Sequence, residues 1–404
     1  MVLVPGKVIL DAAERGKFGV PALNINEMLQ LQAYLNAGFE LKSPLILQAS
    51  MGSREFTGWL SHKKANPDLG ARVTIDMINT FSNAYAAEYG YDIPIAVILD
   101  HGPDFKQCKG AIDNGFTMVM IDGSLDYSVK KEGKHPPRSL EENIRLTKEV
   151  VDYAHERGVS VEGELGTLGG IEDKTAATQV LLTEPKEVRP FVEQTRTDAL
   201  AVAIGTSHGA YKFKSVPELA LELVEQIYRE AGDTRLVMHG ASSVPEDLVS
   251  AINHYPILFK GQNKLSLSGV FRTISGDKVL TQEEERVYSL DNVNSILEFA
   301  RDLESYSCMK KSMGVPMEQI QTAIRLGIRK INVDTDGRIA TTGAIKKYLA
   351  DNPGVFDQRK YFEQARNALY EMAISKIKGF GSEGHAKNVE ILTLEQMAKE
   401  YKSR

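Results

Sequence analysis

Three of the eight histidines in this sequence stand at the ends of short apolar runs of the kind that form buried strands. They are His101, His208 and His239. Imidazole is the commonest metal-binding side chain, and three histidines that leave one coordination position open are typical of catalytic rather than structural zinc. A single histidine at a strand end is more often a hydrogen-bonded turn residue, so the metal hypothesis depends on all three lying together.

Carboxylates accompany these histidines. Asp100 directly precedes His101 and is able to transfer a proton beside a metal if a bend at the next glycine, or at the strand end, turns both side chains the same way. Its alternative role is to hydrogen-bond a neighbouring group. Glu162 and Glu164 are two residues apart on one predicted strand and share a face. Buried carboxylates are costly unless they bind cations or hydrogen-bond donors, so Glu164 and Asp122 are candidate metal ligands.

Glycine-containing turns follow three of the predicted strands, at residues 205–209, 239–243 and 332–337. Small residues expose backbone N–H groups, and the helix starts expected nearby add partial positive charge, so both features favour phosphate. Tight turns with helix caps would account for the same residues, which makes each turn alone weak evidence. Arg359 is suited to a second phosphate or to an acid on a surface helix, and composition does not choose between them.

Eight short apolar segments that alternate with longer amphipathic ones would position these residues. All eight end in polar side chains, which a barrel would gather at one mouth. We therefore predict an α/β fold, a closed (β/α)8 TIM barrel. A doubly wound open sheet is the alternative, but its GxGxxG turn is missing after the first strand. The predicted strands are residues 19–24, 44–50, 95–101, 117–123, 160–166, 199–205, 235–240 and 330–334.

The predicted barrel is interrupted once. We assign residues 1–254 and 312–380 to the barrel and residues 255–311 to an inserted small subdomain before the last strand. The insertion contains an alternating segment at 264–274, a Gly-Asp turn signal at 276–277 and a helical pattern at 290–303, which predict a hairpin and a helix. Residues 381–404 form the expected C-terminal tail, with one helix near 393–401.

Composition narrows the function without defining it. The 404 residues are 42% hydrophobic and 25% charged, as in ordinary globular proteins. A net charge of −6 argues against a general nucleic-acid surface, and two cysteines cannot build a multi-disulfide framework. No apolar stretch approaches a bilayer span, and the apolar N-terminus stops before a signal-peptide core could form. We expect a cytoplasmic protein with no nucleic-acid or membrane partner.

Six motifs resemble those of the class II fructose-1,6-bisphosphate aldolases, and specifically the branch often assigned to the Calvin cycle. The resemblance covers about residues 1–253 and 315–379. It implies a (β/α)8 barrel, a divalent metal that is usually zinc, and reversible cleavage of fructose 1,6-bisphosphate to dihydroxyacetone phosphate and glyceraldehyde 3-phosphate via a metal-stabilised enediolate. A homo-oligomer, dimer or tetramer, is expected. The motifs are Leu99-Asp100-His101-Gly102, Val119-Met120-Ile121-Asp122-Gly123-Ser124, Val161-Glu162-Gly163-Glu164-Leu165-Gly166, Ser207-His208-Gly209-Ala210-Tyr211-Lys212, Val237-Met238-His239-Gly240 and Asn332-Val333-Asp334-Thr335-Asp336.

The resemblance also implies roles by position. His101, His208 and His239 would bind the catalytic metal. Asp122 and Glu164 would serve a second or alternate cation position, divalent or monovalent. Asp100 would exchange the proton of the C4 hydroxyl, and Glu172, which follows Gly169-Gly170-Ile171, would act as an acid at the triose carbon. The residues implied in substrate binding are Asn24, Ser50, Gly209, Lys212, Gly240, Ser242, Asn332, Asp334, Thr335 and Arg359.

Other readings stay open at this point. Tagatose 1,6-bisphosphate is a close alternative substrate, because these motifs do not reveal the configuration of one hydroxyl. A metal-dependent barrel hydrolase would commonly carry His-x-His after its first strand, and the chain has none. A catalytically silent scaffold is disfavoured by the intact histidines and Asp100. A Schiff-base aldolase would need an active-site lysine, for which Lys330 is the only candidate beside a strand.

Overall fold

The structure is a computed structural model that describes residues 2–130, 134–167, 169–170, 180–208, 219–242, 252, 257–261, 264–275, 278–289, 291–298 and 314–403. Side chains at positions 2, 169–170, 207–208 and 257–287 are outside this description. The predicted turn at 276–277 falls outside it. Within the described part of the chain, no helix has the length and apolar character needed to cross a bilayer.

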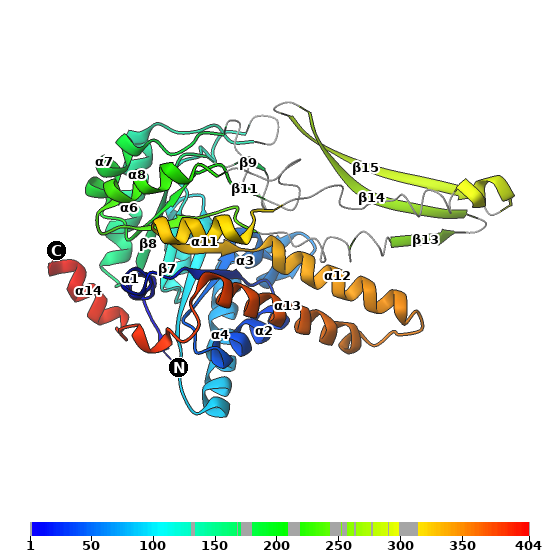
Figure 1. Cartoon of the computed structure of the whole chain (residues 1–404), viewed down its shortest axis with the longest axis horizontal. Helices are drawn as coiled ribbons and strands as arrows, with labels where there is room; N and C mark the ends of the chain where they lie inside the picture. Colours follow the sequence, from blue (N-terminus) through cyan, green and yellow to red (C-terminus); the bar gives the residue numbers. More distant parts are fainter. Residues whose placement is uncertain are drawn as a thin grey trace.

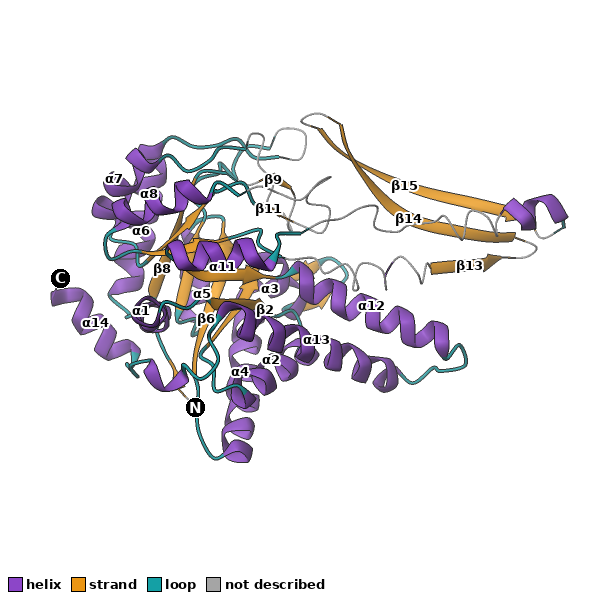
Figure 2. Cartoon of the chain, in the orientation of Figure 1, coloured by secondary structure: helices purple, strands orange, loops and turns teal. Residues whose placement is uncertain are grey.

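Eight parallel strands close into a barrel, which confirms the predicted (β/α)8 fold. Each strand pairs with the next along the chain, the last pairs with the first, and pairing of the third with the fourth completes the ring. Figure 2 shows this strand cylinder surrounded by helices. The barrel strands are β2 (Val20–Asn24), β3 (Leu45–Ser50), β6 (Pro94–Gly102), β7 (Met118–Ile121), β8 (Ser160–Leu165), β10 (Ala199–Val202), β12 (Arg235–Met238) and β16 (Ile328–Val333).

Helices on the outside cover the apolar outer face of the strands. Leu47 and Leu99, for example, belong to the large buried cluster that the strands share with these helices. Several helices begin at side chains that accept backbone N–H groups, such as Ser139 for α6 and Asn66 for α4. The outer helices are α2 (Met28–Glu40), α3 (Met51–Thr57), α4 (Pro67–Tyr89), α5 (Phe105–Asp113), α6 (Leu140–His155), α7 (Pro185–Thr195), α8 (Leu221–Ala231), α11 (Met317–Leu326), α12 (Thr335–Asp351) and α13 (Gln358–Phe380).

The barrel interior changes character from one end to the other. Because side chains alternate across a strand, every second side chain of each barrel strand points inward. Near the strand starts these positions are apolar, as at Val20, Ile46 and Ala96, and they form one cluster with α1 (Gly6–Gly16). Helix α1 therefore closes the base of the barrel. Near the strand ends the inward positions are buried and polar; they include Gln48, Asp100, Glu162, Glu164, His239, Lys330 and Asn332.

The C-terminal tail packs at the base of the barrel. The predicted tail helix is present as α14 (Leu394–Ser403), and Tyr401 on it stacks on His155 of α6 with ring centroids 3.6 Å apart. Figure 1 shows α14 beside α1. Strand β1 (Val2–Leu3) pairs with β6, so both termini lie near this end.

The segment predicted as an insertion contains a long antiparallel hairpin. Strand β14 (Lys264–Ser275) pairs with β15 (Lys278–Ser289), and β13 (Ile257–Gly261) pairs with the other edge of β14. These strands agree with the alternation predicted at 264–274. A described helical stretch at 293–298 lies within the predicted helix 290–303. Figure 1 shows β14 and β15 extending away from the barrel. The division into a barrel and an insertion subdomain stays a prediction.

Candidate active site

The end of β6 holds an irregularity that brings two successive side chains to the same place. The pairing of β6 with β7 shifts between Leu99 and Gly102, so Asp100 and His101 together oppose one residue of β7. This arrangement is a β-bulge, which commonly redirects a side chain beside an active site. His101 has a φ of 47°, in the left-handed region that non-glycine residues enter at a cost of about 1–3 kcal/mol. The predicted bend therefore exists, and it lies at His101 itself.

His101 faces a second histidine across the barrel mouth. His239 directly follows β12, and its Nδ1 lies 3.0 Å from Nε2 of His101, with the ring planes at 86° to one another. Asp100, His101 and His239 all present potential ligand atoms within 4.8 Å of one another, and all three residues are buried. Two of the three predicted histidine ligands are therefore together, with the predicted proton-transfer aspartate beside them.

Two further carboxylates approach the other side of His101. Oδ2 of Asp122 lies 3.3 Å from its Nδ1 and Oε2 of Glu164 lies 3.7 Å from it, so His101, Asp122 and Glu164 form a second potential metal group. Oε2 of Glu164 is buried and has no hydrogen-bond partner among the described residues. Because an unpartnered buried carboxylate oxygen is costly, this atom fits a cation.

Burial and the nearby charges shift the pKa values of three buried groups at the site. Burial opposes charge on His101, but Asp100, the hydrogen bond to Asp122 and the charge of Glu164 outweigh it and raise the His101 pKa well above its usual value. Burial, followed by the nearby charge of Asp122, raises the pKa of Glu164 well above its usual value. Burial also opposes charge on Asp122, yet its hydrogen bonds, led by that with His101, lower its pKa to about 2. The site is an acidic cluster that attracts positive charge.

Asp122 is held by two groups that the sequence did not single out. Oδ1 accepts a hydrogen bond from the hydroxyl of Ser124 at 2.7 Å and from its backbone N–H at 3.2 Å. The hydroxyl of Tyr127 donates to Oδ2. A carboxylate with these donors keeps a fixed orientation toward His101.

Asp100 is oriented by two amide groups, one from the neighbouring strand β3 and one from β16. Asn332 Nδ2 donates to Oδ1 at 3.0 Å, and Gln48 Nε2 lies 3.3 Å from Oδ2. Asn332 was predicted from its motif, whereas Gln48 was not. Its only signal in the sequence is a polar residue two positions before the end of an apolar strand, and the register of β3 with β6 brings it against Asp100.

A network of fully buried side chains lies directly beneath the histidines. Glu162 Oε1 lies 2.8 Å from His239 Nε2, and Lys330 Nζ lies 2.9 Å from Glu162 Oε2. Lys330 Nζ also donates to Asn332 Oδ1 at 2.7 Å. The side chains of Glu162, Lys330 and His239 are 0% exposed. This network joins the histidine end of the site to Asn332 and Asp100.

The predicted triose-phosphate residues lie at the ends of β12 and β16. Gly240 has a φ of 60°, in the left-handed region where glycine is favoured, and Ser242 is buried. Asp334 and Thr335 stand at the start of α12, whose first N–H groups suit an anion. Asp334 also binds Arg338 at 2.7 Å. These four residues are close in the chain to the histidine site, and their contact with phosphate remains a prediction.

Two other predicted substrate residues are the last residues of β2 and β3. Asn24 ends β2 and donates to Asn26 at 3.3 Å. Ser50 ends β3, pairs in register with Asp100 and accepts the backbone N–H of Ser53 at 3.1 Å as the N-cap of α3. Both therefore lie at the same end of the barrel as Asp100.

The remaining predicted residues either fall outside the description or lie on the surface. His208 lies on β11 (Ser207–His208), which pairs with β9 (Gly169–Gly170), but its side chain is outside the description. Glu172, Gly209 and Lys212 are outside it entirely. Arg359 is the second residue of α13, is 85% exposed and binds Asp357 at 2.8 Å. The surface ion pair that the sequence allowed is therefore the contact that Arg359 makes.

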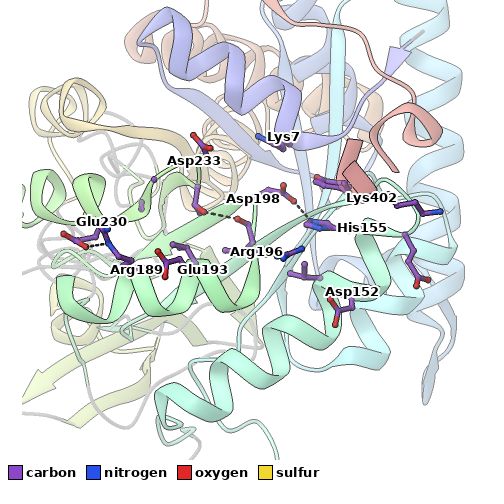
Figure 3. Close-up of a pocket in the computed structure, with 18 of the residues that line it drawn as sticks. Lys7, Asp152, His155, Arg189, Glu193, Arg196, Asp198, Glu230, Asp233 and Lys402 are labelled. Carbon is purple, nitrogen blue, oxygen red and sulfur yellow. Dashed lines mark hydrogen bonds and ion pairs between the residues drawn. The ribbon is translucent and has the colours of Figure 1, made fainter. Parts of the chain in front are cut away.

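A hollow of about 760 Å³ lies at the opposite end of the barrel. Figure 3 shows charged side chains around it, including His155 of α6 and Asp198, which directly precedes β10. Four of its charged groups pair with one another: His155 binds Asp198 at 3.0 Å, and Arg189 binds Glu230 at 2.8 Å. We place the chemistry at the other end, because the carboxyl ends of barrel strands carry the catalytic groups.

Comparison with known proteins agrees with this geometry. The family model for Fructose-bisphosphate aldolase class-II matches residues 4–385. A fructose-bisphosphate aldolase of Giardia intestinalis is 41% identical over 404 residues and covers 100% of both chains, and one from Nostoc sp. is 37% identical with 99% of this chain and 96% of its own covered. The crystal structure of the YdjI aldolase from Escherichia coli superposes with a TM-score of 0.61 at 25% identity, covering 95% of this chain and 99% of its own. The chain therefore belongs to the class II fructose-bisphosphate aldolases, a family of metal-dependent lyases.

Proposed function

We propose that this chain reversibly cleaves fructose 1,6-bisphosphate to dihydroxyacetone phosphate and glyceraldehyde 3-phosphate. One observation carries the proposal within the family: the buried group of Asp100, His101 and His239 at the carboxyl ends of the barrel strands. A proton-transfer acid directly beside two imidazole ligands is what metal-assisted cleavage of a β-hydroxy ketone requires.

His101 and His239 would hold a divalent ion, with His208 as the third imidazole. The residues fit such an ion, because two ring nitrogens face one another and a buried Glu164 oxygen lacks a hydrogen bond. Zinc is our proposed metal, since nitrogen ligands with one open position suit it. When bound, the ion would act as a Lewis acid toward the negative charge that develops on the ketone fragment. Asp122 and Glu164 would serve a second or alternate cation position.

Asp100 would remove the proton of the C4 hydroxyl during cleavage and return it during condensation. Its two oxygens accept from Asn332 and Gln48, so its carboxylate is fixed while a lone pair stays available for the proton. Glu172 would exchange the proton at the triose carbon from the other side of the bond. The two acids then have separate tasks at different carbons.

Phosphate binding would position the sugar between these groups. We assign the triose phosphate to the turn after β12 and the start of α12, at Gly240, Ser242, Asp334 and Thr335, with Gly209 and Lys212 completing that side. We assign Asn24 and Ser50 to the rest of the substrate. Anchoring both ends of the sugar converts remote binding energy into alignment of the C3–C4 bond. We also propose that the protein is a homo-oligomer.

A Schiff-base mechanism is disfavoured by the surroundings of Lys330. Its ammonium group is fully buried, binds Glu162 at 2.9 Å and donates to Asn332 at 2.7 Å. A lysine nitrogen that is engaged by a buried carboxylate and an amide oxygen is poorly placed to attack a carbonyl. The metal route therefore has the better support from the described residues.

A cleavage assay on fructose and tagatose bisphosphates, with and without a chelator and with zinc added back, tests the proposal. We expect faster cleavage of the fructose ester, loss of activity in chelator and recovery with zinc. Treatment with borohydride in the presence of substrate should leave the activity intact. Full activity in chelator together with trapping by borohydride would contradict the metal route, and preference for tagatose bisphosphate would replace the substrate assignment.

A further inference from the structure

Glu162 and Lys330 form an ion pair with no solvent contact inside the barrel. Both side chains are 0% exposed, and Lys330 Nζ lies 2.9 Å from Oε2 and 3.1 Å from Oε1 of Glu162. Removing two charges from water costs about as much as their attraction returns, so a buried pair of this kind adds little net stability. The role of the pair therefore lies in the groups that Glu162 and Lys330 contact.

Glu162 contacts the ring nitrogen of His239 that points away from the cation site. Glu162 Oε1 lies 2.8 Å from Nε2, while Nδ1 faces His101 Nε2 at 3.0 Å and Asn332 Nδ2 at 3.2 Å. An ionised carboxylate only accepts hydrogen bonds, so Nε2 must carry the proton. The lone pair of a neutral His239 is then on Nδ1, the nitrogen that points to the cation site.

Lys330 fixes the orientation of a second group. An ammonium only donates, so the atom of Asn332 that faces Lys330 Nζ at 2.7 Å must be the amide oxygen. The NH2 end of Asn332 is thereby turned toward Asp100, to whose Oδ1 it donates at 3.0 Å. One buried pair thus sets the direction of both a metal-binding ring and the amide that holds Asp100.

We propose that Glu162 and Lys330 are positioning residues of the metal site: Glu162 selects the His239 tautomer that presents Nδ1 to the metal, and Lys330 anchors Glu162 and orients Asn332 toward Asp100. This inference rests on the proposed metal-dependent function. Both side chains are fully buried beneath the histidines, and we assign neither of them a contact with the reacting sugar.

Metal affinity is the readout that separates positioning from a purely structural role. Competition with a chromogenic chelator measures the affinity for zinc, and the visible absorption of the cobalt-loaded protein reports the ligand geometry. We expect the double variant Glu162→Leu/Lys330→Met, which removes both charges together, to fold and to bind zinc roughly tenfold to a hundredfold more weakly. Glu162→Gln keeps an acceptor oxygen and should retain part of that affinity.

The matched control is Glu14→Gln, which breaks the ion pair of Arg329, the residue next to Lys330 on β16. Arg329 precedes Lys330 on β16, and its Nε lies 2.7 Å from Glu14 of α1, on the other side of the strand. Glu14→Gln should lower the melting temperature while zinc affinity and the cobalt spectrum stay those of the wild type. Loss of a partly buried ion pair by itself would then be shown not to weaken metal binding.

At saturating zinc, the double variant should lose roughly tenfold or more in kcat with a smaller change in KM, because Asn332 and Asp100 lose their alignment. Wild-type zinc affinity and cobalt spectrum in the double variant would overturn the proposal. If the double variant does not fold, unchanged affinity in Glu162→Gln would overturn it equally. A wild-type protein that binds zinc but cleaves neither sugar would refute the proposed function and leave this inference standing.

Discussion

Nδ1 of His239 lies 3.0 Å from Nε2 of His101, although the two residues are 138 positions apart in the chain. Two nitrogen lone pairs at this distance repel one another unless a proton or a cation lies between or beside them. We propose that a metal ion does so here, between the end of β6 and the end of β12. Asp100 stands at a regular inward position of β6, and His101 reaches the same place because the β6 bulge turns it inward as well.

Asp100→Asn should separate catalysis from metal binding. The substitution keeps the size of the side chain but removes the base, so we expect kcat to fall by roughly 10²- to 10⁴-fold while the zinc content stays near that of the wild type. His208→Ala, measured alongside, should lose zinc as well as activity. Metal analysis and steady-state kinetics on both variants make the comparison. Equal loss of zinc in the two would contradict the separate roles.

Gly102→Ala should disturb the bulge that presents His101. A Cβ at this position would lie 2.5 Å from the backbone oxygen of Met120 and 2.7 Å from the Cys108 sulfur, so the strand end must move. We expect a loss of about 1–3 kcal/mol in the free energy of unfolding, measured by urea denaturation, together with weaker zinc binding. Gly354→Ala is the control, because a Cβ there meets nothing within 4 Å. Similar behaviour of the two variants would show that the bulge tolerates change.

Glu14→Gln should reduce the sensitivity of the fold to acid. Burial opposes the charge of Glu14, but its contacts, led by the hydrogen bond from Lys17, lower its pKa from 4.5 to about 2. A lowered folded-state pKa means that the contribution of Glu14 to stability is present above pH 4.5 and is lost as the pH falls toward 2. The difference in melting temperature between wild type and variant should therefore shrink across this window. A constant difference from pH 7 to pH 2.5 would exclude this linkage.

The fold was predictable because its strands carry a plain signal. All eight predicted strands are present, with ends that differ by a few residues, since buried parallel strands read as short apolar runs. Their polar ends also placed His101, His239, Asp100 and Asn332 at one mouth. In a closed barrel of parallel strands, the polar residues at the strand ends all lie at the same end of the barrel.

The supporting groups were harder to foresee. Gln48 and Tyr127 appear in the sequence as ordinary polar residues, and only the strand register brings Gln48 against Asp100. Lys330 stood out as a possible nucleophile, and its pairing with Glu162, 168 positions away, gives it a different role. Contacts between residues so far apart depend on how the barrel closes, which no local pattern encodes. The bend at His101 is similar, because a non-glycine residue gives no warning of a left-handed backbone.

X-ray diffraction from zinc-loaded crystals, measured on both sides of the zinc absorption edge, tests the central claim most directly. The anomalous difference map should show one strong peak about 2.0–2.1 Å from both Nε2 of His101 and Nδ1 of His239, with His208 as a further ligand. A strong peak elsewhere, with none between these two rings, would contradict the account.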